Sequence, residues 1–564
     1  MPLAVGYTPR LPGVSAEIWG MIDEWVTLRR APLAAATLLL IHSVGFGMAH
    51  AGDFFVDCGA GNDSESGQSP ATAWDSLDPV NSATLAAGDR ILFRRGSECS
   101  GSLRPQGSGQ PGNPIRLAAY GTGPLPIIRA LPFDDATILL SDQEYWEIEN
   151  LEVIGGQTFG IHITGVQPGT LRGFRIIDTV VRDVTGVPTN KESGLVIVSP
   201  GSADTLFDDV VIDGVEAHHS TQWAGILVGG DDFGYMPTSP RSSNVTVRNS
   251  LVHHVAGDGI ALYQVNHGLL EKNVVYDTGL APDTSVGTPN GIWTWMCHDC
   301  TVQFNEGYRT HSPGVDGGVF DIDYGCSDNV VQYNYAHDAD GYCVSVFGAY
   351  WPTTNSVVRY NVCANNAKDP SKAFQGDIYV LTWGGGTIEG LEVYNNTVLW
   401  DPAASAFAVN IQGQIGGAAG NVALFKNNIV VSTVPFITKL DPRVDIEIDN
   451  NLYWHTGTMP TRWGYGAEFL TPFDQWQALG YDGDGVFADP QWWSPTGGSS
   501  AAFRLTDESP AIDAGAVIAS DSSAHPTQPP PVVGATRDIG AYEWKPGLPR
   551  SGIPSRERPK RRDR

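Results

Sequence analysis

The chain has 564 residues, of which 41% are hydrophobic and 17% are charged. This composition is sufficient for a large buried core and excludes a disordered chain. The formal net charge of −28 argues against nucleic acid as a partner, because a polyanion is attracted to a positive surface.

The N-terminal segment has the layout of a secretory signal. A pair of arginines precedes an apolar run that is interrupted by two polar residues and ends in Ala49-His50-Ala51, an A-x-A cleavage site. We expect residues 1–51 to be removed, with Met21 as an alternative start. The sequence therefore predicts a secreted or periplasmic protein with no membrane span in its mature form.

An eight-residue unit repeats through the middle of the chain. It occurs at 176–183, 212–219, 247–254, 271–278, 303–310, 332–339, 359–366, 393–400, 425–432 and 448–455. Its third position is Asn at 249, 273, 305, 334, 361, 395, 427 and 450. A spacing of roughly 23 to 36 residues suits one coil of a β-solenoid. We expect these asparagines to form an inward column that hydrogen-bonds neighbouring coils.

A second strand, which begins with glycine, follows most of these units. Examples are GIALY at 259–263, GIWTW at 291–295 and GGVFDID at 317–323. Short β-branched runs between Gly and Asn corners, without an amphipathic helical pattern, predict parallel strands stacked coil on coil.

With these repeats, the opening segment 88–123 and the closing segments 503–515 and 537–544, the chain resembles the right-handed parallel β-helix (pectin-lyase-like) family of secreted carbohydrate-active proteins. The resemblance implies an all-β solenoid of about ten or more coils. Its single domain would span 52–544, with an N-terminal cap and a C-terminal closing segment. The segment 545–564 contains eight Lys or Arg and two acids, which is typical of a disordered basic tail.

Alternation along the glycine-led strands predicts which side chains face outward. It places Tyr263, Trp293, Trp295, Asp321 and Asp323 on the outer surface, with the two carboxylates exposed to solvent beside the tryptophans. A solvated pair of like charges costs little free energy, whereas a buried pair would be expensive.

The seventh position of the repeat is polar in consecutive coils. It holds Arg182, His218, His253, Asp277, Arg309, Asp338 and Asn365, and His337 adjoins it. We expect this ladder to lie along one edge of the glycine-led sheet and to complete a sugar-binding groove. Its substrate-binding residues would be Trp293, Trp295, Tyr263, Arg309, His253, His218, Asp277 and His337.

Three functions remain open at this point. The first is a glycoside hydrolase that needs no cofactor, with Asp321 and Asp323 as the catalytic pair and Asp338 as a third candidate. The second is a uronate polysaccharide lyase in which these three acids bind Ca²⁺ and Arg309, His253 or Lys372 is the base. The third is a non-catalytic glycan-binding or adhesive solenoid. In each case the partner is a poly- or oligosaccharide, and we expect a monomer.

Seven cysteines in an exported chain allow at most three disulfides. Cys58 and Cys99 are isolated near the mature N-terminus, and we expect them to pair. Cys297 and Cys326 each lie eight residues before a repeat Asn, so they would stack in adjacent coils and could form a bridge. Cys300 competes with Cys297 for Cys326, and the pairing of Cys343 and Cys363 stays open.

Overall fold

The computed structural model describes residues 51–230, 236, 238–416, 423–470, 472–494, 498–522 and 531–546. All but the last residue of the predicted signal peptide, and all but the first two residues of the predicted basic tail, lie outside these ranges. None of the helices in the described residues is long and apolar enough to span a membrane.

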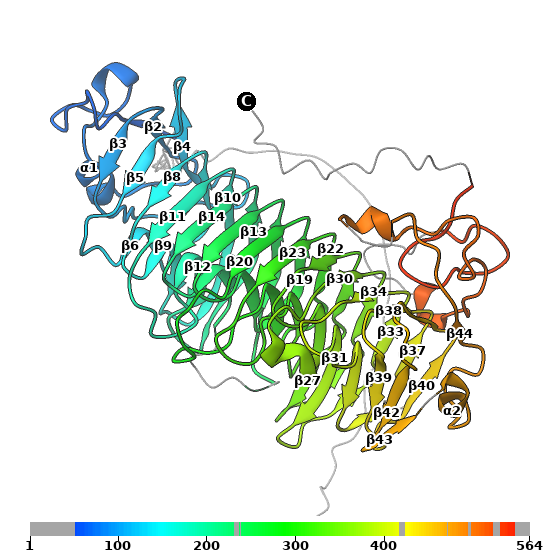
Figure 1. Cartoon of the computed structure of the whole chain (residues 1–564). Coiled ribbons are helices and arrows are strands. Elements are labelled where there is room, and N and C mark those ends of the chain that lie inside the picture. Colours follow the sequence, from blue (N-terminus) through cyan, green and yellow to red (C-terminus); the bar gives the residue numbers. More distant parts are fainter. Residues whose placement is uncertain are drawn as a thin grey trace, which may run out of the picture. The chain divides into compact units, whose positions relative to one another are not determined.

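Three long sheets form the body of the described chain (Figure 1). Sheet 1 has 14 strands: β1 (Asp53–Val56), β2 (Arg90–Arg94), β4 (Ile115–Tyr120), β7 (Trp146–Glu149), β10 (Gly169–Ile177), β13 (Thr205–Asp213), β16 (Ser242–Arg248), β19 (Val265–Glu271), β22 (Thr301–Gln303), β25 (Val330–Gln332), β29 (Val357–Arg359), β33 (Glu392–Tyr394), β37 (Ala423–Lys426) and β40 (Ile446–Asp449). Sheet 2 also has 14: β3 (Glu98–Ser100), β5 (Ile127–Arg129), β8 (Glu152–Ile154), β11 (Val180–Val184), β14 (Glu216–Ser220), β17 (Leu251–Val255), β20 (Val274–Thr278), β23 (Glu306–Thr310), β26 (Tyr335–His337), β30 (Val362–Ala364), β34 (Thr397–Trp400), β38 (Ile429–Ser432), β41 (Leu452–His455) and β44 (Val486–Phe487).

Sheet 3 contains the glycine-led strands and has 13 members among the described residues: β6 (Ala136–Ser141), β9 (Phe159–Gly165), β12 (Gly194–Pro200), β15 (Ala224–Val228), β18 (Ile260–Tyr263), β21 (Ile292–Trp295), β24 (Phe320–Ile322), β27 (Val344–Ala349), β31 (Ile378–Trp383), β35 (Val409–Gln412), β39 (Phe436–Leu440), β42 (Arg462–Tyr465) and β43 (Glu468–Leu470). A small sheet joins β28 (Thr353–Thr354), β32 (Ile388–Glu389) and β36 (Ile415–Gly416). The helical segments are short: α1 (Asp78–Ser82), α2 (Phe473–Gln477), η1 (Pro70–Thr72), η2 (Pro370–Gln375), η3 (Ser500–Phe503) and η4 (Ala519–Ser522).

Each complete coil contributes one strand to sheet 1, one to sheet 2 and one to sheet 3, as β10, β11 and β12 do before β13 returns to sheet 1. The coils stack in parallel register: Ile260 lies beside Ile292, and Ile292 beside Phe320. All three of these side chains are fully buried. The parallel solenoid predicted from the repeat is therefore confirmed, and its core is the column of inward apolar residues.

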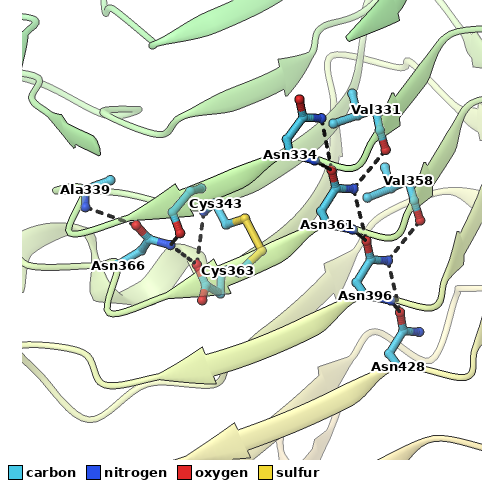
Figure 2. The surroundings of a disulfide bond; sticks show 12 residues. Val331, Asn334, Ala339, Cys343, Val358, Asn361, Cys363, Asn366, Asn396 and Asn428 are labelled. Carbon is cyan, nitrogen blue, oxygen red and sulfur yellow. Dashed lines mark hydrogen bonds between the residues drawn. A yellow bond between two sulfur atoms is a disulfide. The ribbon is translucent and has the colours of Figure 1, made fainter. Parts of the chain in front are cut away.

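An asparagine column runs inside the corner between sheets 1 and 2, and it contains half of the predicted positions. Its members are Ser250, Asn273, Asn305, Asn334, Asn361, Asn396, Asn428 and Asn451. Figure 2 shows part of it: Asn361 Nδ2 donates to the Val331 carbonyl at 2.8 Å and to Asn396 Oδ1 at 3.0 Å. Each amide thus ties one coil to its neighbours.

Half of the predicted column positions were wrong by one residue. Asn249, Asn395, Asn427 and Asn450 precede the true column and adopt φ values of 52, 53, 56 and 54°. Asn tolerates this left-handed conformation better than most residues. Asn therefore occurs at two adjacent corner positions for different reasons: the first has the left-handed backbone, and the second has the inward amide. In the Asn-Asn pairs, only the second residue points inward.

The cysteines divide into two disulfides and three free thiols. Cys58 and Cys99 are bonded, as predicted, and Cys343 is bonded to Cys363 (Figure 2). The predicted bridge from Cys326 to Cys297 or Cys300 was wrong, because all three are free and buried. The coils stack as expected, with Cys297 N donating to Cys326 Sγ at 3.4 Å, but Cys297 Sγ points to the Leu262 carbonyl at 3.3 Å.

Candidate active site

A pocket of about 450 Å³ lies on the outer surface of sheet 3, over β21, β24, β27 and β31. Loops that lead from sheet 2 into sheet 3 supply Lys191, Thr288, Asn290, Val315, Asp316, Phe374 and Gln375. The strands and their carboxyl ends supply Trp293, Asp321, Asp323, Tyr324, Phe347, Tyr379, Leu381 and Trp383. This volume is typical of a site for a small ligand.

Asp321 points outward from β24, as strand alternation predicts, and lies between Trp293 of β21 and Ser345 of β27. Full solvation was nevertheless a wrong expectation. Asp321 is only 2% exposed, and Asp323 is partly buried. Burial arises because the loops before β21, β24 and β31 fold over this surface of the sheet and enclose it.

Hydrogen bonds hold the buried Asp321 carboxylate on both oxygens. Ser345 Oγ donates to Oδ1 at 2.6 Å, and Asn290 Nδ2 donates to Oδ2 at 3.1 Å. The amide of Asn290 is oriented in turn by the Tyr342 hydroxyl, which donates to its Oδ1 at 2.8 Å. Asp321 is therefore fixed in place, and each of its carboxylate oxygens already accepts one hydrogen bond.

Asp316 also lines the pocket, and sequence reasoning did not single it out. It is partly exposed, at the end of the loop before β24. Thr288 Oγ1 donates to its Oδ2 at 2.5 Å, and the Tyr342 hydroxyl lies 3.5 Å from its Oδ1. Asp316 and Asp323 thus enter the pocket from opposite ends of one strand, with Asp321 between them.

The three carboxyl groups retain protons more strongly than free aspartate does. Burial raises the pKa of Asp323 to about 7, and the charge of Asp316 adds to this effect. Burial and the charge of Asp323 raise the pKa of Asp321 well above its usual value. Burial also raises the pKa of Asp316, but the Thr288 hydrogen bond and the charge of Lys191 oppose the rise.

Lys191 is the only cationic residue among the described residues that line the pocket. Its ammonium group lies 4.8 Å from the ring centre of Trp293 and 5.8 Å from that of Trp223. Both distances are typical of cation–π contacts. The repeat contains no signal for this residue, because Lys191 belongs to the loop that leads into β12, four coils before β24.

The predicted aromatic residues occupy different environments. Trp293 lines the pocket, whereas Tyr263 and Trp295 do not belong to its lining. Tyr263 is 1% exposed and packs edge-on against Trp293, with ring centres 5.0 Å apart. Tyr263 is therefore a packing residue, and its predicted contact with substrate was wrong.

The predicted ladder of polar residues lies on sheet 2, away from the pocket on sheet 3. Its members His218, His253, Asp277, Arg309 and His337 belong to β14, β17, β20, β23 and β26, and Asp338 follows β26. The single groove of the sequence analysis was thus wrong, because every coil turns a corner between the two sheets. Asp338 is also removed from the proposed catalytic or Ca²⁺-binding set for the same reason.

The ladder itself consists of two columns. His218, His253, Tyr276, Tyr308 and His337 stack with ring centres 4.8 to 5.0 Å apart. Asp277, Arg309 and Asp338 lie one position further, with φ values of 49, 48 and 54°. Of the predicted ladder, His218 and His253 belong to the first column, whereas Asp277, Arg309 and Asp338 belong to the second. The predicted register was therefore wrong by one residue from Asp277 onward.

The three residues proposed as the base of a lyase do not line the pocket. Arg309 pairs with Asp277 at 2.7 Å on sheet 2, the sheet that also carries His253. Lys372 is 2% exposed and donates to Asp369 at 2.6 Å. The described residues contain one cluster with metal-ligand spacing, Cys343, Cys363 and Asp377. Its two sulfur atoms form a disulfide (Figure 2), which leaves no thiolate to bind a metal.

Comparisons with known proteins agree on the architecture. A family model described as "Right handed beta helix region" matches residues 194–398. The native GH136 lacto-N-biosidase of Eubacterium ramulus superimposes with a TM-score of 0.50 and 19% identity, over 73% of this chain and 68% of that one. The chain is therefore a right-handed parallel β-helix protein, as the sequence predicted.

One curated relative is similar in sequence. Lacto-N-biosidase of Bifidobacterium longum subsp. longum is 24% identical over an alignment of 481 positions, and the alignment covers 67% of this chain. The aligned part is 29% of the relative, so this chain spans less than a third of that protein's length.

Proposed function

We propose that this protein is a glycoside hydrolase that cuts a poly- or oligosaccharide in the pocket on sheet 3. The observation that carries the proposal is the group of three aspartates, Asp316, Asp321 and Asp323, in a pocket with aromatic walls. Glycoside hydrolysis uses two carboxyl groups on either side of the scissile bond, one protonated and one ionised.

Asp323 is the proton donor in this proposal. Its pKa of about 7 keeps a proton on the carboxyl group near neutral pH, which suits a general acid. The side chain is partly exposed and lies in the pocket lining, so it can reach a leaving oxygen.

Asp316 is the ionised partner, which attacks the anomeric carbon or activates water. A hydroxyl donor and the charge of Lys191 favour its ionised form. Asp321, the other half of the pair proposed from the sequence, is held by Ser345 and Asn290 and is almost unexposed. We assign Asp321 a positioning role, in which its hydrogen bonds to Ser345 and Asn290 tie β24, the strand that leads to Asp323, to β27 and to the loop before β21.

The substrate class follows from the walls of the pocket and from the relative. Aromatic rings stack on the apolar faces of sugars, and a volume of about 450 Å³ suits a short sugar unit. The name of the curated relative gives lacto-N-biosides as the first substrates to try. Two disulfides and the predicted signal support action outside the cytoplasm.

The test compares four variants, Asp316→Asn, Asp321→Asn, Asp323→Asn and, as the control, Asp338→Asn on sheet 2. Each is assayed on lacto-N-biosides and on neutral and uronate glycans for new reducing ends and for the ultraviolet absorbance of unsaturated uronates. We expect the Asp316 and Asp323 variants to lose about 10²- to 10⁴-fold in kcat, with the control unchanged. New absorbance that a chelator abolishes would show a lyase instead, and wild-type activity in both variants would refute the assignment.

A further inference from the structure

Three aromatic rings form a rim at the carboxyl-end side of the pocket. This aromatic rim consists of Tyr324, Tyr350 and Trp383, which come from the ends of β24, β27 and β31. The ring centre of Tyr324 lies 6.0 Å from that of Tyr350 and 6.2 Å from that of Trp383, with near-perpendicular planes. The three side chains therefore make one continuous apolar surface.

Much of this surface is open to solvent. Tyr350 is 62% exposed and Trp383 is 39% exposed. Trp383 is anchored from below by Phe347, whose ring centre lies 5.4 Å away. Contiguous exposed aromatic surface is unfavourable in water, and beside a pocket it indicates a ligand contact.

The backbone is adapted to hold this rim. Tyr350 adopts a φ of 55°, which is costly for a bulky side chain. Gly384 follows Trp383, and a Cβ atom there would lie 2.7 Å from the Tyr350 ring. The absence of a side chain at Gly384 thus allows the Tyr350 ring to lie close to the turn after β31.

The rim lies next to the proposed acid. Tyr324 directly follows Asp323, and both Tyr324 and Trp383 belong to the pocket lining. A sugar in the pocket that is joined to a second sugar through the oxygen protonated by Asp323 would place that second ring over the rim. Aromatic surfaces bind pyranose rings through their apolar faces.

We propose that the aromatic rim is a subsite for the pyranose ring on the far side of the scissile bond. The subsite makes the protein bind an oligosaccharide more tightly than the disaccharide at its end. This inference rests on the proposed function, because it takes Asp323 as the acid that marks the scissile bond.

The experiment measures binding by titration calorimetry in the full chain with Asp323→Asn, which prevents turnover. The probes are lacto-N-biose with lacto-N-tetraose, cellobiose with cellotetraose, and digalacturonate with tetragalacturonate. Trp383→Ala and Tyr350→Ala are each added to this background. The matched control is Phe133→Ala, which removes an aromatic side chain that is 91% exposed and outside the pocket lining.

For the pair that binds, we expect Trp383→Ala and Tyr350→Ala each to weaken tetrasaccharide binding about tenfold. The disaccharide affinity should stay within about twofold of the Asp323→Asn parent, and Phe133→Ala should change neither. Equal losses for both lengths, or no loss in either variant, would overturn the subsite alone. A parent that binds none of the six saccharides would overturn the proposed function and the subsite together.

Discussion

The ammonium group of Lys191 lies 4.8 Å from the ring centre of Trp293, although 102 residues separate them in the sequence. This contact brings a positive charge to a pocket that holds three aspartates. The charge of Lys191 lowers the pKa values of Asp316, Asp321 and Asp323 against the larger effect of burial. Lys191 is therefore placed to set how many protons the cluster holds at a given pH.

Replacement of Lys191 should move the pH profile of hydrolysis. Without the positive charge the ionised carboxylates are less stable, so their pKa values rise further. We expect both limbs of the kcat/KM profile of Lys191→Met to shift by about one unit to higher pH. Lys191→Arg keeps the charge and should resemble the wild type, as should Lys272→Met on an exposed surface. An unchanged profile for Lys191→Met, or a shift to lower pH, would contradict this role.

The alkaline limb of the wild-type profile should report Asp323. A general acid acts only while it is protonated, and the pKa of Asp323 is about 7. Activity should therefore be present below this value and fall as the pH rises through it. Substrates whose leaving groups need no proton should lose the limb, which steady-state kinetics with an activated aryl glycoside would show. A limb that persists with such substrates would assign it to another group.

The asparagine column predicts different effects for two adjacent residues. Asn451 Nδ2 donates to the Phe425 carbonyl at 2.9 Å and to Asp482 at 2.8 Å, and its Oδ1 accepts from Asn428. Asn451→Ala removes these three buried hydrogen bonds and should lower the free energy of unfolding by at least about 2 kcal/mol. Asn450→Gly preserves the left-handed backbone and should change it by less than about 0.5 kcal/mol. Urea unfolding of both variants tests the register, and equal effects would refute it.

Thiol titration should give three free cysteines per chain. Of the seven cysteines, four form the two disulfides, and Cys297, Cys300 and Cys326 are at most 1% exposed. A maleimide should label none of them rapidly in the native protein and all three after unfolding in guanidine without a reductant. A single labelled thiol would instead show that the bridge predicted from the repeat exists.

The sequence was informative where the structure is periodic. Strand alternation placed Trp293 and Asp321 side by side on the outer surface, because parity along a strand is a local property. Because side chains alternate between the two faces of a strand, an error of one residue in the register assigns each side chain to the wrong face. The repeat contains Asn at two successive positions in some coils, so the inward Asn396 could not be distinguished from the neighbouring Asn395.

The loops and corners could not be predicted in the same way. Lys191 and Asp316 come from loops without a repeat, whose conformation depends on contacts with distant residues such as Trp293 and Thr288. No sequence pattern gives the angle at the corner between sheets 2 and 3. The sequence therefore could not show that Arg309 lies on a different sheet from the pocket. Burial of Asp321 was missed for the same reason, since it results from the covering loops.

A crystal structure of the full chain with Asp323→Asn and a bound oligosaccharide would show whether the pocket on sheet 3 is the site of hydrolysis. We expect a glycosidic oxygen within hydrogen-bond distance of residue 323, the anomeric carbon facing Asp316, and the next sugar ring on Tyr350 and Trp383. A saccharide bound on sheet 2 along the column that includes His253, with the pocket on sheet 3 empty, would contradict this expectation.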